Sequence, residues 1–226
     1  MINIRPHKLF KVVESKSCFA RTISVVLPGL LHTPMLLETA ILIALSKIVN
    51  AKTFFEFGTF VGVQTLNITH NLPESSNVYT LDLDNDSFNR IMKSQNQHDL
   101  KLSQMHFKHE AKLAFIDSPY EGKITRLYGD SNEFDFSDFK GKIDMVYIDG
   151  GHDLRTVRSD TENAFNMLPP PSMSCIAWHD YGNPNYPDNT NFLNKLSEEL
   201  YIFHVEETMI CFYLKNASTS LISELA

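Results

Sequence analysis

The stretch TFFEFGTFVG, residues 53–62, decides the fold. Its first five residues are largely apolar and read as a buried β-strand, and glycines follow at Gly58 and Gly62. The next run, Val63 to Thr69, can open a helix. A strand, a glycine loop and a helix in this order predict an α/β domain with a ligand-binding loop after the strand.

Six more stretches read as strands, and helical patterns separate most of them. The helical patterns begin at Thr33, Leu154 and Asn189. The further strands are Asn77–Asp82, Lys123–Tyr128, Ile143–Asp149, Ser174–Asp180, Tyr201–Val205 and Met209–Leu214. The alternation predicts an α/β, Rossmann-like, doubly wound and mostly parallel seven-stranded sheet, and the last two strands predict a C-terminal antiparallel hairpin.

Composition limits the class of protein. With 226 residues the chain fits one domain, and its net charge of −7 argues against a nucleic-acid partner, which would need clustered Lys and Arg. Its apolar runs fall short of the about 20 residues that span a bilayer, so no membrane segment is expected. Three cysteines without C-x-x-C spacing favour a reducing compartment, and we expect a cytoplasmic protein.

Carboxylates mark the ends of five predicted strands. They are Glu56, Asp82, Asp130, Asp149 and Asp180. In an open parallel sheet, ligands bind beyond the carboxyl ends of the strands, near the point where strand order reverses. Five acids at this edge, together with the glycine loop, predict a ligand site there.

The loop also indicates the class of cofactor. A dinucleotide site usually has a glycine where this chain has Phe60, because the backbone must approach a pyrophosphate. A cofactor without phosphates tolerates Phe60, and a positively charged tail on it would favour Glu56 nearby. Asp82 suits the two hydroxyls of a ribose, with Asp84 as the alternative.

Five motifs in order resemble a known family. The runs EFGTFVG, YTLDLD, YGDS, MVYIDGGH and AWHDY, within residues 34–214, resemble class I S-adenosylmethionine-dependent methyltransferases, especially the metal-assisted O-methyltransferases of small molecules and sugars. The resemblance implies S-adenosylmethionine as cofactor. The implied cofactor-binding residues are Glu56, Gly58, Thr59 and Gly62 for the methionine part, Asp82 for the ribose, Asp130 and Ser131 beside adenine, and Asp149.

The resemblance also implies catalytic residues. Asp149 stands where the family's aspartate meets a divalent cation, and His152 stands in the position of the base. An imidazole with an ordinary pKa of about 6.5 can accept a hydroxyl proton near neutral pH. The alternative for His152 is that it merely caps the next helix.

A metal site is expected from Asp149, Asp180 and His179. Metal-assisted relatives have an acid pair where this chain has His179-Asp180. Mg²⁺ prefers oxygen ligands, so the histidine either weakens the case for Mg²⁺ or shifts the preference toward another divalent cation.

The predicted organisation has one extension and one insertion. Residues 1–32 form an N-terminal extension that covers the acceptor or makes a homodimer, residues 33–226 form the methyltransferase domain, and a polar helical segment is inserted at about 95–118. The predicted function is O-methylation of a small molecule or sugar (EC 2.1.1.-) with His152 as general base. The alternatives are a non-catalytic cofactor-binding or scaffold domain and an NAD-dependent oxidoreductase.

Overall fold

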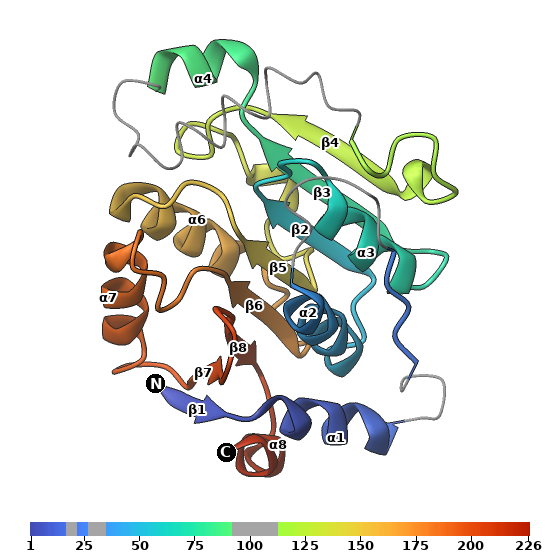
Figure 1. Ribbon diagram of the computed structural model, residues 1–226, viewed down its shortest axis with the longest axis vertical. Coiled ribbons are helices and arrows are strands. Elements are labelled where there is room, and N and C mark those ends of the chain that lie inside the picture. Colours follow the sequence, from blue (N-terminus) through green and yellow to red (C-terminus); the bar gives the residue numbers. More distant parts are fainter. Residues whose placement is uncertain (17–21, 27–34, 92–112) are drawn as a thin grey trace.

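One eight-stranded sheet forms the centre of the computed structural model, which describes residues 1–16, 22–26, 35–91 and 113–226 (Figure 1). The strand order is β1-β7-β8-β6-β5-β2-β3-β4, and only β8 runs antiparallel to its neighbours. The strands are β1 (Ile2–Ile4), β2 (Thr53–Phe57), β3 (Asn77–Asp82), β4 (Ile124–Tyr128), β5 (Met145–Ile148), β6 (Ser174–Trp178), β7 (Ile202–Val205) and β8 (Cys211–Lys215).

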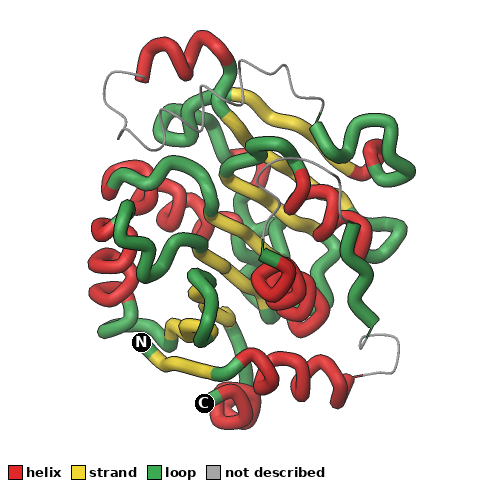
Figure 2. The backbone as a smooth tube through the Cα atoms, in the orientation of Figure 1, coloured by secondary structure: helices red, strands yellow, loops and turns green. Residues whose placement is uncertain are grey.

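Helices cover both faces of the sheet (Figure 2). On one face α1 packs on α2 and α8, and α2 also contacts α3; on the other face α6 lies against α7. Each face has its own apolar cluster, and Phe54 and Phe55, adjacent on β2, point into different ones. The helices are α1 (Pro6–Lys16), α2 (Leu36–Ile48), α3 (Val63–Asn71), α4 (Asn85–Ile91), α6 (Leu154–Met167), α7 (Pro187–Leu196) and α8 (Thr219–Leu225).

The sheet has one strand more than the seven predicted from the sequence. Ile2–Ile4 pairs in parallel with β7, and Ile4 is buried. The following helix, α1, buries Leu9 and Val12 in the same core. Residues 1–16 therefore pack in the same core as the rest of the domain. The strand was not predicted because three residues are too few to show an alternating pattern. The predicted roles of residues 1–32 over the acceptor or in a dimer stay predictions.

The polar insertion predicted at about 95–118 lies mostly outside the described residues. Of it, residues 113–118 are described, and they form turns and not a helix. Leu113 and Phe115 are buried against Leu66 of α3. The Phe115 ring also fills the space beside Gly62, where an added Cβ would come within 2.7 Å of it. This end of the segment belongs to the support of the glycine loop.

Strand order reverses between β2 and β5. From β2 the chain moves outward to β3 and β4, then returns to the other side of β2 with β5 and β6. Gly58 directly follows β2 with φ +91°, and a Cβ there would lie 2.2 Å from the carbonyl oxygen of Asp149. Only glycine allows this approach. The loops after β2 and β5 therefore touch through their backbones.

Two observations bear on the protein's surroundings. In the described ranges, no helix combines the length and the apolar character that a membrane span needs. Cys175 and Cys211 are buried free thiols, and Cys18 lies outside the described residues.

Asp160 of α6 is a buried acid. Its side chain is fully buried. Burial raises the pKa of Asp160 to about 7, and the Ser131 hydroxyl only partly opposes this rise. The native protein therefore holds this proton more tightly than the unfolded chain does.

We predict that replacing Asp160 with Asn flattens the pH dependence of stability between about pH 4 and 7. Because the native pKa of Asp160 is raised, its proton favours the native state at low pH, and this contribution is lost as the pH rises through 7. At about 1.4 kcal/mol per pKa unit, the free energy of unfolding of the wild type should fall by roughly 3–4 kcal/mol more than that of Asp160→Asn. Urea titrations at several pH values measure this difference. Glu162→Gln, an exposed change on the same helix, should follow the wild type, and parallel curves for all three proteins would contradict the prediction.

We predict that Gly58→Ala destabilises the protein by more than about 2 kcal/mol, because the new methyl group overlaps the Asp149 carbonyl and φ is positive. Gly122→Ala is the matched control, since nothing lies within 4 Å of its Cβ position. Thermal and urea denaturation of both variants measure the difference. Equal midpoints for the two variants would show that the loops do not touch as described.

Candidate active site

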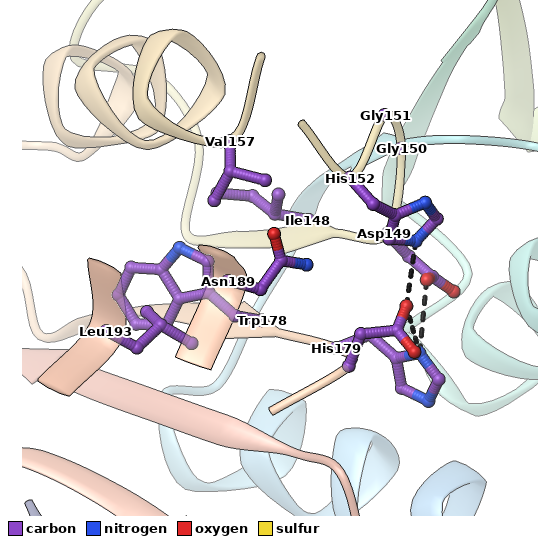
Figure 3. A pocket seen from close by; sticks show the side chains of 11 residues that line it. Ile148, Asp149, Gly150, Gly151, His152, Val157, Trp178, His179, Asn189 and Leu193 are labelled. Atoms are coloured by element: carbon purple, nitrogen blue, oxygen red, sulfur yellow. Dashed lines mark ion pairs between the residues drawn. The ribbon is translucent and has the colours of Figure 1, made fainter. Parts of the chain in front are cut away.

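A small hollow lies at the carboxyl ends of β5 and β6, and its lining includes histidine and aspartate side chains (Figure 3). His152 comes from the loop after β5, and His179 follows β6 directly. The apolar wall includes Ile148, Val157, Trp178 and Leu193, while Asn189 of α7 adds a buried amide. Strand residues and helix residues both contribute to the apolar wall, and the charged groups come from the loops after β5 and β6.

Asp149, His179 and Asp180 meet at the mouth of this hollow. The Nδ1 atom of His179 lies 3.2 Å from Oδ1 of Asp149 and 3.3 Å from Oδ2 of Asp180. One ligand atom from each of the three residues lies within 4.8 Å of the other two. The three predicted metal ligands are therefore brought together.

Charge dominates the protonation of this cluster. Burial by itself would lower the pKa of His179, but the carboxylates of Asp149, Asp180 and Glu38 outweigh it and hold this pKa well above its ordinary value. Burial by itself would raise the pKa of Asp180, but the contacts of Asp180 with His152 and His179 hold this pKa well below the usual range. The raised pKa favours a protonated imidazole while no ion is bound, and an ion bound at Nδ1 would displace the proton on that atom.

His152, the predicted base, is held on two sides. Its Nε2 atom forms a 2.7 Å ion pair with Oδ2 of Asp180. Its ring stacks on Tyr186, with centroids 3.9 Å apart and planes 9° from parallel. The cap of α6 is Asp153, whose carboxylate accepts the N–H groups of Arg155 and Thr156. His152 does not cap the helix, and its ring lines the hollow.

Two residues of the cluster escaped the sequence analysis. Tyr147 donates its hydroxyl to Oδ2 of Asp149 at 3.0 Å, and the two-residue spacing on one strand was a usable signal. Glu38 of α2 lies 3.2 Å from Nε2 of His179 through Oε2. Nothing near Glu38 in the sequence points to His179, which is 141 residues away.

Asp82 ties the end of β3 to the glycine loop. Its Oδ2 accepts the N–H of Phe60 at 2.8 Å, and its Oδ1 accepts the N–H of Leu83 at 2.8 Å. A carboxylate oxygen can accept two hydrogen bonds, so one carboxylate can serve both the backbone and a hydroxyl. Asp84, the alternative for the ribose, instead accepts the N–H of Ser87 in the first turn of α4 at 2.6 Å. The geometry therefore favours Asp82 over Asp84 as the residue that would bind the ribose hydroxyls.

Phe60 occupies a conformation that glycine usually takes. Its φ is +46°, in the left-handed region that costs a residue with a side chain about 1–2 kcal/mol. The hydrogen bond from its N–H to Asp82 helps to hold it there. The loop thus keeps a tight turn without the second glycine of a dinucleotide motif.

Glu56 lies behind the glycine loop and not on its surface. It is 1% exposed, and one of its oxygens accepts the hydroxyls of Thr65 at 2.5 Å and Thr80 at 2.6 Å. Thr59 joins this network through a 2.7 Å contact with Thr80. Burial raises the pKa of Glu56 to about 8, with Asp149 and Asp82 adding to the rise. A bound cation nearby would favour its ionised form.

Asp130 and Ser131 follow β4 next to the end of β3. Asp130 accepts the backbone and side-chain N–H groups of Asn132, and Asn132 also donates to Thr156 of α6. Gly129 donates its N–H to the carbonyl of Asp82. The turn predicted to lie beside adenine is thereby fixed next to Asp82.

The donor set fits a divalent cation of intermediate softness. Two carboxylate oxygens and one imidazole nitrogen are ligands that Mn²⁺, Co²⁺ and Zn²⁺ accept, whereas Mg²⁺ prefers oxygen. Two ligands at about 2.1 Å from an ion, at right angles, lie about 3 Å apart, close to the separations from His179 to its two neighbours.

Comparison with known proteins identifies the family. The sequence model of a methyltransferase domain matches residues 55–181, more than half of the chain. That range contains the glycine loop, Asp82, His152 and the His179-Asp180 pair. No curated protein matches the chain.

Solved structures share the fold. An O-methyltransferase of Bacillus cereus in complex with S-adenosylhomocysteine aligns with TM-score 0.53 at 15% identity, over 92% of this chain and 91% of that one. A methyltransferase of Geobacter sulfurreducens gives 0.54 at 12%, over 92% and 88%. TomG of Streptomyces achromogenes, an O-methyltransferase of tomaymycin synthesis solved with S-adenosylmethionine, gives 0.52 at 13%, over 92% and 87%.

At these identities the structural likeness concerns the fold, and the family assignment rests on the matched sequence model together with the five motifs. The chain belongs to the methyltransferase family, as a class I S-adenosylmethionine-dependent methyltransferase domain.

Proposed function

We propose that this protein transfers the methyl group of S-adenosylmethionine to an oxygen of a small molecule or sugar, with His152 as general base. The observation that carries the proposal is the contact of Gly58 with Asp149. This contact sets the cofactor loop directly beside the hollow that contains His152, so that a methyl donor on one and an acceptor in the other would meet.

The cofactor half is assigned to the loops after β2, β3 and β4. Gly58 and Gly62, both at positive φ, give this loop the tight turn that we assign to the methionine part, and Glu56 and Thr59 support the loop from behind. Asp82 takes the ribose hydroxyls, and Asp130 with Ser131 borders the adenine. The carboxylate of Asp149, which directly follows β5, would attract the sulfonium end.

The reaction we propose is an in-line displacement. The acceptor hydroxyl gives its proton to His152 as its oxygen forms a bond to the methyl carbon, and the sulfur keeps the electron pair of the broken bond, leaving S-adenosylhomocysteine. Asp180 holds His152 and stabilises the imidazolium that results, while Tyr186 fixes the plane of the ring. Holding donor and acceptor in line supplies much of the acceleration.

Asp149, His179 and Asp180 would hold a divalent cation, which when bound lowers the pKa of an acceptor hydroxyl and orients its oxygen. We propose a catechol or a vicinal diol as the acceptor class, because its two adjacent oxygens could both bind such a cation.

We also propose where the reaction takes place and in what assembly. A cytoplasmic location agrees with the buried free thiols of Cys175 and Cys211. A homodimer remains a proposal from the family resemblance, as does the acceptor-covering role of residues 1–32.

A non-catalytic cofactor-binding domain is the second candidate. It is favoured by His179, which stands at an acid's position and forms ion pairs with the carboxylates of Asp149, Asp180 and Glu38. The two candidates differ in whether the wild type methylates any acceptor.

We predict that Asp82→Ala weakens the binding of S-adenosylhomocysteine at least about tenfold. A hydrogen bond to a charged group contributes about 1.5–3 kcal/mol, and each 1.4 kcal/mol is a tenfold change in Kd. Isothermal titration calorimetry measures the affinity. Asp84→Ala is the matched control and should bind within about threefold of wild type. No binding to the wild type would remove the methyltransferase proposal, and equal losses in both variants would remove the assignment of Asp82.

We predict that His152→Ala lowers kcat by about 100- to 10,000-fold while the affinity for S-adenosylhomocysteine stays unchanged, because a positioned base contributes a factor of this size. Formation of S-adenosylhomocysteine is followed with whichever member of a panel of catechols, phenols and monosaccharides the wild type methylates fastest. His7→Ala, an exposed change on α1, is the control. An unchanged kcat in His152→Ala would favour catalysis by positioning alone, and no turnover of any acceptor by the wild type would favour the non-catalytic candidate.

A further inference from the structure

Glu38 is the one member of the charged cluster that comes from outside the strand ends. It lies in the first turn of α2 and is 4% exposed. One oxygen, Oε1, accepts the N–H of Met209 at 2.8 Å, and the other, Oε2, lies 3.2 Å from Nε2 of His179. Met209 belongs to the turn between β7 and β8.

The burial of the Glu38 carboxylate has to be compensated by its contacts. Burying an unpaired charge is costly, so buried acids are normally paired or bound to a metal. Both oxygens of Glu38 have partners, one in the backbone and one in an imidazole. The backbone contact fixes the carboxylate relative to the sheet, and the fixed carboxylate in turn fixes the ring of His179.

The contact decides which nitrogen of His179 faces the cluster. A carboxylate at Nε2 accepts a hydrogen from that atom, so once an ion displaces the proton on Nδ1, Glu38 favours the tautomer with its proton on Nε2 and its lone pair on Nδ1. Nδ1 is the atom that faces Asp149 and Asp180, at 3.2 Å and 3.3 Å. Metal-binding histidines typically have this arrangement, with the second nitrogen donating to a carboxylate or carbonyl.

We propose that Glu38 is a positioning residue for a divalent cation bound by Nδ1 of His179 together with Asp149 and Asp180. The Glu38–His179 pair replaces the second acid that metal-assisted relatives have, and it moves the preference of the site from Mg²⁺ toward cations that accept imidazole. This inference deepens the proposed function and rests on it.

The first test uses Co²⁺ as the probe, because its visible absorption reports a nitrogen ligand and its affinity is measured by calorimetry without any acceptor. Glu38→Gln should bind Co²⁺ about 10- to 100-fold more weakly than wild type, as expected for loss of a carboxylate behind a ligating histidine. Glu162→Gln, a helical acid exposed on α6, should bind as the wild type does. A residue that only supported the fold would not change the cobalt spectrum of the folded protein.

The second test uses His179→Asp, which restores an acid at this position. This variant should bind Mg²⁺ at least about tenfold more tightly than the wild type does, and adding Glu38→Gln to it should no longer weaken metal binding. The cycle isolates the coupling between positions 38 and 179. It also keeps the inference testable if Glu38→Gln alone fails to fold.

Three results would overturn the inference: a Co²⁺ affinity in Glu38→Gln equal to that of the wild type, a Co²⁺ affinity in His179→Ala equal to that of the wild type, or no binding of Co²⁺ to the wild type. Titration of the same samples with S-adenosylhomocysteine in the absence of metal separates the two proposals. If S-adenosylhomocysteine binds and Co²⁺ does not, the inference about Glu38 fails and the proposal of methyl transfer stands.

Discussion

The contact between Gly58 and the carbonyl oxygen of Asp149 is the constraint on which the rest of the site depends. It lies where strand order reverses, between β2 and β5, and it admits no side chain. In the proposed function, the glycine loop binds the methyl donor, and the loop after β5 carries His152, the base for the acceptor. A side chain at position 58 would push the two loops apart and so separate the methyl donor from the acceptor.

Around that contact, the protein balances a high density of negative charge. Glu38, Asp149 and Asp180 approach one another near the same sheet edge in a chain whose net charge is already −7. His179 lies among these carboxylates, and His152 pairs with Asp180. Like charges at these distances are unfavourable without a cation, so the histidines keep the cluster assembled before any ligand arrives.

Local patterns predicted most of the fold, because apolar runs with glycine or proline at their ends identify buried strands. The start of α6 at Leu154 was predicted, and β2 and β3 were predicted with both of their bounds. The strand at Ile2–Ile4 was missed, since its stability comes from pairing with β7, some 200 residues later. Sequence motifs likewise found His152 and Asp180 but not Glu38, whose role arises only when α2 packs beside β6.

The first strand also protects the protein from self-association through its sheet. Without β1, the edge of β7 would present unpaired N–H and C=O groups, which are a template for another chain. Parallel pairing from Ile2 to Ile4 covers that edge with a segment too short to act as a template in its turn. At the far edge, β4 carries Arg126, whose guanidinium lies over the ring of Tyr128, and a charge in this place discourages edge-to-edge aggregation.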